Sequence, residues 1–170
     1  MLNFLFARLT PGLERGAEAF DAAAAIARQP AFYRLGEVPD TLDGRFALLA
    51  TILALLLVRI EHEGEAGNEL SVAITERFIA AMEAEHRELG LGDPTLGKTV
   101  RKLVGALSRR VDLWRTAVAT NGAWAAATRS SVYAADPDPA ALVQVSDRLR
   151  MIWSRFVAAD MAAIGKGDVG

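Results

Sequence analysis

The stretch PDTLDGRFALLATILALLLVRI, residues 39–60, decides the fold. From Phe46 to Val58 every residue except Thr51 is apolar. A helix that is apolar on all sides must be surrounded by lipid or by other helices. The run would span only ~20 Å as a helix, against a hydrocarbon core of ~30 Å, and Arg45 and Arg59 bracket it closely. The stretch therefore predicts the central helix of a helical bundle and not a membrane span.

The residues before the apolar run form a signal for the start of a helix. Pro39 fixes its backbone φ angle, and Asp40 or Thr41 can cap the first backbone N–H groups. Asp43 then places a negative charge at the positive end of the helix dipole. We therefore expect the central helix to begin within this signal.

Helical spacing of apolar residues continues on both sides of the central stretch, and no alternating strand pattern, long linker or internal repeat is evident. The predicted fold class is all-α, a single-domain helical bundle of about six to seven helices around a buried central helix. The expected parts are an N-terminal helical segment 1–30 with its helix starting at Thr10, a helical core 31–133, and a C-terminal helix within 139–164. Within the core a turn is expected at 63–68 and helices at 69–89 and from Asp93 to about residue 120, and a loose tail is expected at 165–170.

Composition excludes several classes of chemistry. The chain has no Cys, so disulfides, thiolate zinc sites and thiol catalysis are ruled out. The formal charge of −2 argues against bulk nucleic-acid binding, and we expect no DNA partner. The first residues have neither a secretory signal nor a transit peptide, because the apolar run Leu2–Phe6 is short and Thr10-Pro11 interrupts it. We therefore expect the protein to stay in a bacterial cytoplasm.

The segment Gly92–Thr99, GDPTLGKT, matches the phosphate-binding pattern G-x-x-x-x-G-K-[ST]. That loop works only when a buried β-strand precedes it and aims it at the phosphates. Here the preceding residues form a charged amphipathic pattern, and Pro94 suits a helix start. A helix–turn–helix corner is the favoured interpretation, and a nucleotide-binding enzyme that uses Gly92–Thr99 is kept as the alternative.

No grouping of residues predicts a catalytic or metal site. One Glu-x-x-His unit occurs at Glu83–His86, but a carboxylate-bridged di-iron bundle needs two such units and two further inward Glu residues. The chain has only two His residues, and both lie among acids. We therefore predict no metal, no cofactor and no enzymatic activity.

The distribution of charge changes sign along the chain. The stretch Glu61–Asp93 is rich in acids, and the next predicted helix is basic. On that helix Lys98, Lys102 and Arg109 share one face. Two interpretations remain open: a solvated face that pairs with the neighbouring acidic helix, or a docking strip for RNA or anionic lipid headgroups. The second would make the protein a general membrane- or RNA-binding helical adaptor.

Three short motifs carry a resemblance to a known family. They are Phe32-Tyr33, PDTLDGRF at Pro39–Phe46, and GLGD at 90–93 followed by Lys98. Over about Ala31–Tyr133 the chain resembles the ubiquinol–cytochrome c chaperone family, assembly factors for respiratory complex III. The resemblance implies a helical, non-enzymatic protein that binds nascent or newly inserted cytochrome b. Mitochondrial relatives do so with a small partner at the ribosomal tunnel exit, on the inner face of the membrane.

The resemblance also implies a set of motif residues for client or partner binding. We expect Arg45 either to interact with a partner or to form an internal ion pair with Asp40 or Asp43. The implied location is the cytoplasmic side of a bacterial inner membrane, as a peripheral protein, with the ribosome and the inner-membrane surface as further candidate partners. The matching residues are Phe32, Tyr33, Pro39, Asp40, Thr41, Asp43, Gly44, Arg45, Phe46, Gly92, Asp93 and Lys98.

Overall fold

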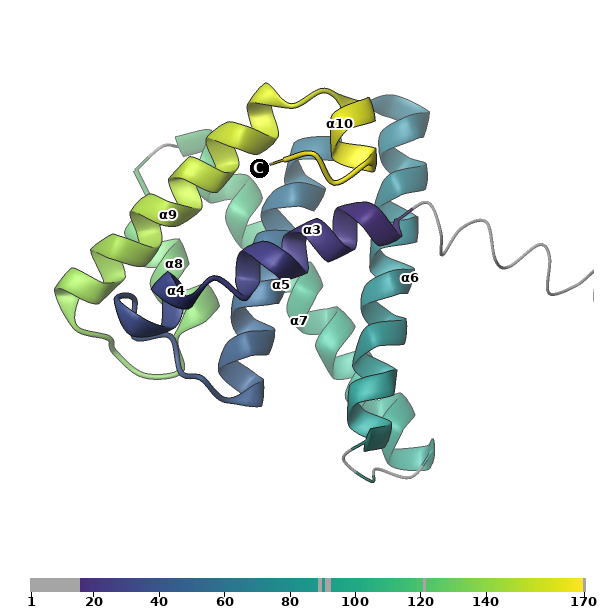
Figure 1. Ribbon diagram of the computed structural model, residues 1–170, viewed down its shortest axis with the longest axis horizontal. Helices are drawn as coiled ribbons and strands as arrows, with labels where there is room; N and C mark the ends of the chain where they lie inside the picture. Colours follow the sequence, from purple (N-terminus) through teal and green to yellow (C-terminus); the bar gives the residue numbers. More distant parts are fainter. Residues whose placement is uncertain (1–15, 89, 91–92, 121, 170) are drawn as a thin grey trace, which may run out of the picture.

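Helix α5 (Leu42–Ile60) runs through the middle of the structure, a computed structural model that describes residues 16–88, 90, 93–120 and 122–169 (Figure 1). All residues from 50 to 58 are buried. The helices that contact α5 are α3 (Ala17–Ala27), α6 (Gly64–Glu88), α7 (Asp93–Thr120), α8 (Trp124–Val132) and α9 (Pro139–Ala158). This arrangement confirms the predicted all-α bundle around a buried central helix, and the described residues include no β-strand.

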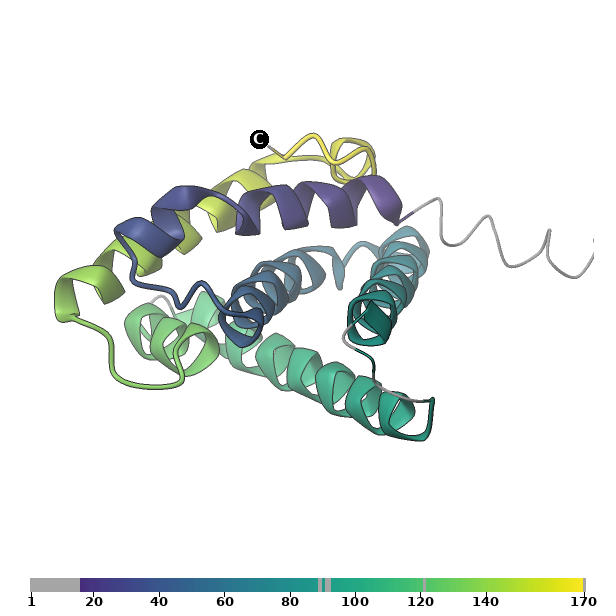
Figure 2. The same cartoon turned by 60° about the horizontal axis from the view of Figure 1, so that its bottom comes forward.

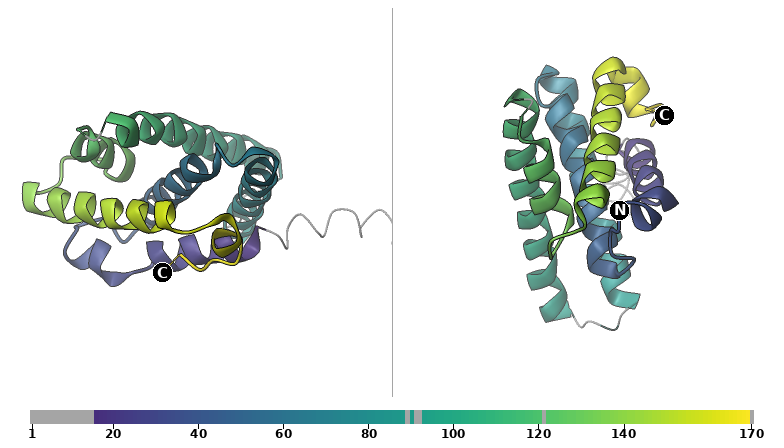
Figure 3. Two further views of the ribbon diagram at one scale, coloured as in Figure 1. Left: turned by 90° about the horizontal axis from the view of Figure 1, so that it is seen from above. Right: turned by 90° about the vertical axis from the view of Figure 1, so that its left-hand side faces the viewer.

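The helices form layers on either side of α5. Figure 2 shows α3 and α9 on one side of α5, together with the short helices α4 (Pro30–Arg34) and α10 (Met161–Gly165). Helices α7 and α8 lie on the other side, and α6 closes the edge between the layers (Figure 3). Among the described helices, none combines the length and the apolar content that crossing a membrane requires.

The one polar residue within the apolar run is held in a buried network. Thr51 is fully buried, and its hydroxyl lies 2.6 Å from the hydroxyl of Ser131 and 2.7 Å from the carbonyl oxygen of Ala47. The indole N–H of Trp114 donates to the Ser131 hydroxyl at 3.1 Å. Because a buried polar group without a partner is costly, this network ties α5, α7 and α8 into one relative position.

Two arginines hold the carboxyl ends of neighbouring helices. Arg59 on α5 donates to the carbonyl oxygens of Phe156 at 3.0 Å and Ala159 at 3.1 Å, at the end of α9. Arg110 on α7 donates twice to the carbonyl oxygen of Ser131, at 3.1 and 2.8 Å, in the last turn of α8. Carbonyl groups in the last turn of a helix lack intrahelical donors, and the helix dipole is negative there, so both guanidinium groups stabilise these ends.

Helix α6 begins earlier than predicted. The expected turn at 63–68 is wrong, because α6 starts at Gly64 and not near Glu69. Gly64 has a positive φ of 63°, which lets the chain reverse direction within a few residues of the end of α5. A Cβ atom on Gly67 would lie 2.1 Å from the carbonyl oxygen of Ile60, so glycine at this position permits the two helices to meet closely.

The C-terminal region also differs from the prediction. The single helix expected within 139–164 is two helices, because Ala159 is extended and Asp160 caps the start of α10 by accepting a hydrogen bond from the Ala163 amide at 2.8 Å. The loose tail expected at 165–170 is wrong for its described residues, since Val169 is buried. The start of the expected N-terminal helix at Thr10 lies outside the described residues.

Thr51→Val should lower the free energy of unfolding by about 1–3 kcal/mol, because the Ser131 hydroxyl loses one of its two partners inside the core. Thr116→Val is the matched control: its hydroxyl also bonds to the carbonyl four residues earlier, at 3.2 Å, but it is exposed. The control should change stability by no more than about 0.5 kcal/mol. Urea unfolding measures both, and equal losses would contradict the assigned network.

A candidate client-binding cleft at the start of α5

A cleft of about 570 Å³ lies where the first turns of α5 meet α3, α4 and α6. Its apolar walls come from all four helices, and charged side chains stand among them. The apolar lining residues are Ala24, Ala27, Pro30, Leu42, Phe46, Leu49 and Met82, and the polar ones are Arg28, Tyr33, Arg34, Asp40, Arg45 and Glu85.

Two residues of the apolar run line the cleft and are not fully covered. Phe46 and Leu49 are half-buried, whereas the run is completely buried from residue 50 onward. The Phe46 ring packs against Phe78, with ring centroids 5.9 Å apart, and the guanidinium group of Arg110 lies 5.7 Å from the Phe46 centroid. The packed ring therefore offers one partly uncovered apolar surface to the cleft.

A smaller hollow of about 30 Å³ adjoins the cleft and shares several of its residues. Leu42, Phe46, Met82 and Glu85 line both spaces, and Leu103 from α7 borders the smaller one. The apolar surface therefore continues from α4 across the first turns of α5 to the flank of α7.

The start of α5 is shaped by one close backbone contact. The Thr41 hydroxyl caps the helix by accepting a hydrogen bond from the Gly44 amide at 3.2 Å, which confirms Thr41 among the two predicted caps. A Cβ atom on Gly44 would lie only 2.0 Å from the carbonyl oxygen of Pro39. Glycine is therefore required where the incoming loop crosses the helix.

Asp40 and Arg45 form an ion pair beside the cleft, with Arg45 Nε 2.6 Å from Asp40 Oδ1. The hydrogen bond from Arg45 lowers the pKa of Asp40 below its usual value. Both side chains are exposed, Asp40 at 62% and Arg45 at 64%, so the pair adds little to stability. Of the two roles expected for Arg45, the internal pair with Asp40 is confirmed, and contact with a partner stays a prediction.

The adjacent aromatic residues of α4 have different surroundings. Phe32 is fully buried in the core. Tyr33 lines the cleft, and its hydroxyl donates to the carbonyl oxygen of Ala27 at 2.7 Å. Burial raises the pKa of Tyr33, while the nearby positive charge of Arg45 opposes that rise. Tyr33 is therefore a neutral, anchored aromatic wall at neutral pH.

The sequence of residues 35–167 matches the family model described as ubiquinol–cytochrome c chaperone. The chain belongs to this family. Its structure is also similar to the crystal structure of the Cbp3 homolog from Brucella abortus, with a TM-score of 0.79 and 28% sequence identity over 99% of this chain and 94% of that chain. No curated protein sequence matches the chain. The resemblance inferred from the sequence motifs is therefore confirmed.

The residues that carried the resemblance to the chaperone family occupy different places. Tyr33, Asp40, Arg45 and Phe46 line the cleft, and Asp43 borders the smaller hollow. Phe32, Pro39, Thr41 and Gly44 build the core and the helix start beside it. Gly92 lies outside the described residues, Asp93 is the first residue of α7, and Lys98 is exposed on α7 and does not line the cleft.

The sequence alone did not indicate several residues of the cleft. Leu49 was assigned to the covered core, and Arg28, Arg34 and Glu85 belong to no motif. They line the cleft because α3, α4 and α6 meet α5 there (Figure 1), and short sequence patterns do not predict how separate helices meet. Met82 is buried on α6 and forms one wall of the cleft.

The phosphate-loop pattern at Gly92–Thr99 does not have the required context. Residues 93–99 form the first turns of α7, and the element before them is helix α6. A phosphate-binding loop needs an open backbone at the end of a strand. The helix–turn–helix interpretation fits these elements, and the nucleotide-binding alternative receives no structural support.

Tyr133 holds the loop that leads into α5, because its hydroxyl donates to the carbonyl oxygen of Gly36. Burial, with a smaller contribution from the negative charge of Glu37, raises the pKa of Tyr133 from 10.0 to about 12. The folded protein therefore keeps this proton at pH values where the unfolded chain loses it, so this contribution to stability is present below pH 10 and disappears as pH rises toward about 12.

The free energy of unfolding should therefore fall between pH 10 and about 12 and fall less steeply in Tyr133→Phe. Urea unfolding of both proteins, below pH 10 and within this interval, measures the difference. The variant should also be somewhat less stable below pH 10, since it lacks the bond to Gly36. An identical pH dependence in the two proteins would contradict the role given to Tyr133.

Proposed function

We propose that the protein is a non-enzymatic assembly chaperone that holds an apolar segment of newly made cytochrome b in the cleft while ubiquinol–cytochrome c reductase is assembled. The observation that carries the proposal is the incomplete cover of Phe46 and Leu49. A helix that is apolar on all sides is normally covered by other helices on every side. At Phe46 and Leu49 the neighbouring helices leave a cleft. Membership of the ubiquinol–cytochrome c chaperone family supports the same function.

The lining of the cleft suits a segment of a membrane protein. Its walls offer aliphatic, aromatic and thioether side chains, and Met82 can adapt to differently shaped apolar groups. Arg28, Arg45 and Glu85 provide charged contacts for the polar flank of a helix laid across it. The volume of about 570 Å³ accommodates a few client side chains, so the client helix would lie over the cleft and insert one face.

The site of action follows from the chemistry of the client. Cytochrome b is an integral membrane subunit, and its apolar helices need protection until they are inserted and joined by partner subunits. We place the protein as a peripheral component at the cytoplasmic face of the inner membrane. Contact with the ribosome that makes cytochrome b is part of the same proposal.

A charged substitution at Leu42 tests whether the client binds in the cleft. Leu42 lines the cleft and is 37% exposed, and a charge there would disfavour contact with an apolar client. Leu42→Glu should fail to restore complex III in a host that lacks the gene. Leu35→Glu is the matched control, since Leu35 is 57% exposed and does not line the cleft. Heme b spectra of membranes and cross-linking to newly made cytochrome b are the measurements.

Both variants must first show the thermal unfolding of the wild type, so that loss of folding is excluded. The control should restore complex III and cross-link like the wild type. Normal complex III in the deletion strain would overturn the proposed function. Full activity of Leu42→Glu would instead move the client to another surface and leave the chaperone function standing.

A further inference from the structure

The outward face of α7 carries a strip of cations between residues 98 and 109. Lys98, Arg101, Lys102 and Arg109 are all exposed, and no acidic residue occurs between Lys98 and Val111. Four charges within eleven helical steps span ~16 Å along one helix. In a protein with a formal charge of −2, this basic strip is a local concentration of positive charge.

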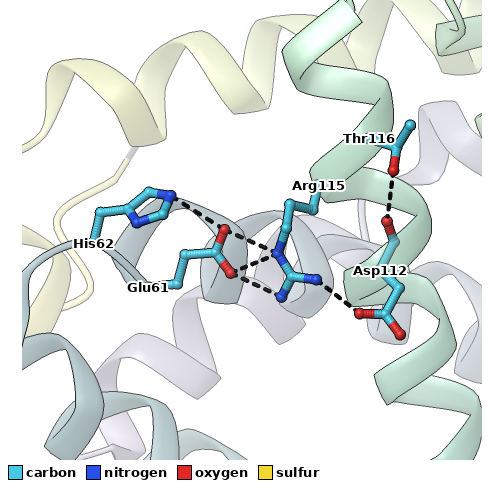
Figure 4. Close-up of polar contacts among 5 residues, drawn as sticks. All are labelled: Glu61, His62, Asp112, Arg115 and Thr116. Atoms are coloured by element: carbon cyan, nitrogen blue, oxygen red, sulfur yellow. Dashed lines mark hydrogen bonds and ion pairs between the residues drawn. The ribbon is translucent and has the colours of Figure 1, made fainter.

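The other two arginines of α7, Arg110 and Arg115, differ from the strip because each bonds to other groups of the protein. Figure 4 shows Arg115 between Glu61 and Asp112, with Nη2 2.8 Å from Glu61 and Nη1 2.7 Å from Asp112. Arg110 is half-buried and donates to backbone carbonyl groups. Both side chains therefore have partners within the protein.

The four cations of the basic strip form no ion pair with any residue that the structure describes. Among the described residues, none of the four cations pairs with acidic α6, which was the first of the two interpretations that the sequence left open. Within α6, Glu83 pairs with Arg87. No bulky side chain stands at two of the positions between these cations, because Gly105 and Ser108 are small residues. The charge of the strip is therefore available to a flat anionic partner.

The side chains of the strip distinguish between two anionic partners. It contains no aromatic ring on which a base could stack and no Asn or Gln to read a base edge, which are the usual means of recognising single-stranded RNA. Attraction to lipid headgroups needs only Lys and Arg close to the surface, and each contributes separately.

We propose that the basic strip docks the protein on anionic phospholipid headgroups. Leu103, which follows Lys102 in the chain, borders the smaller hollow that joins the cleft. The strip and one lining residue of the smaller hollow therefore lie on the same helix, at neighbouring positions in the chain. This inference rests on the proposed function only for the membrane location, and its test needs no client.

The test is cosedimentation of the full chain with phosphatidylcholine vesicles that contain phosphatidylglycerol, and with vesicles of phosphatidylcholine alone. Lys98→Glu/Arg109→Glu should bind the anionic vesicles at least roughly 30-fold more weakly than the wild type. Arg155→Glu/Lys166→Glu is the matched control, because it reverses one exposed Arg on α9 and one exposed Lys just after α10. Each variant changes the formal charge from −2 to −6, and the control should bind nearly as the wild type does.

Either of two other outcomes would overturn the proposal that the strip docks on lipid. Equal losses in the two variants would mean that net charge, and not the strip, attracts the vesicles. Binding of duplex RNA through the strip without binding to anionic vesicles would make RNA the partner. Leu42→Glu separates this inference from the proposed function: it should bind vesicles normally while losing the client, so either proposal can fail alone.

Discussion

The structure depends on the need to cover α5 on all sides. Each buried Leu or Ile of this helix contributes about 1.5–3 kcal/mol, whereas an exposed ion pair such as Asp40–Arg45 contributes at most about 1 kcal/mol. The packing of the surrounding helices is therefore decided by apolar contact, and the surface charges are free to serve other purposes. The one polar group of the run, Thr51, is tolerated because Ser131 and Trp114 complete its network.

Buried apolar contact brings helices together but does not choose among similar packings, and here polar contacts add that choice. The Thr51 network and the two arginines that hold the ends of α8 and α9 are satisfied in one arrangement of the helices. Arg110 also lies against Phe46. The same side chain therefore links the end of α8 to a lining residue of the cleft.

The sequence predicted the features that follow from local chemistry. The all-round apolar run predicted a covered helix, and the PDTLDG signal predicted its start, with Thr41 as one of two candidate caps. The close contact of Gly44 with the carbonyl oxygen of Pro39 appears only in the structure. The sequence prediction failed where contacts between separate segments determine the structure. The start of α6 at Gly64 was missed, and there α5 and α6 meet closely at Ile60 and Gly67. The burial of Val169 was also missed, because its own segment shows no helical pattern. The cleft was only partly predictable for the same reason, because Arg28 and Glu85 reach it through the crossing of helices.

Two surfaces remain without a partner in the part of the chain that the structure describes, and they differ in chemistry: one is apolar and the other is positively charged. Phe46 and Leu49 keep apolar surface uncovered, and the basic strip keeps charge without a partner among the described residues. A single partner could contact both only if it carried apolar and anionic surface together, and a helix emerging at the face of an anionic bilayer has that combination. Since Leu103 joins the smaller hollow to the helix that carries the strip, a change in the position of α7 would alter both surfaces at once. Such a coupling fits the proposed lipid contact on α7, because α9 does not line the cleft.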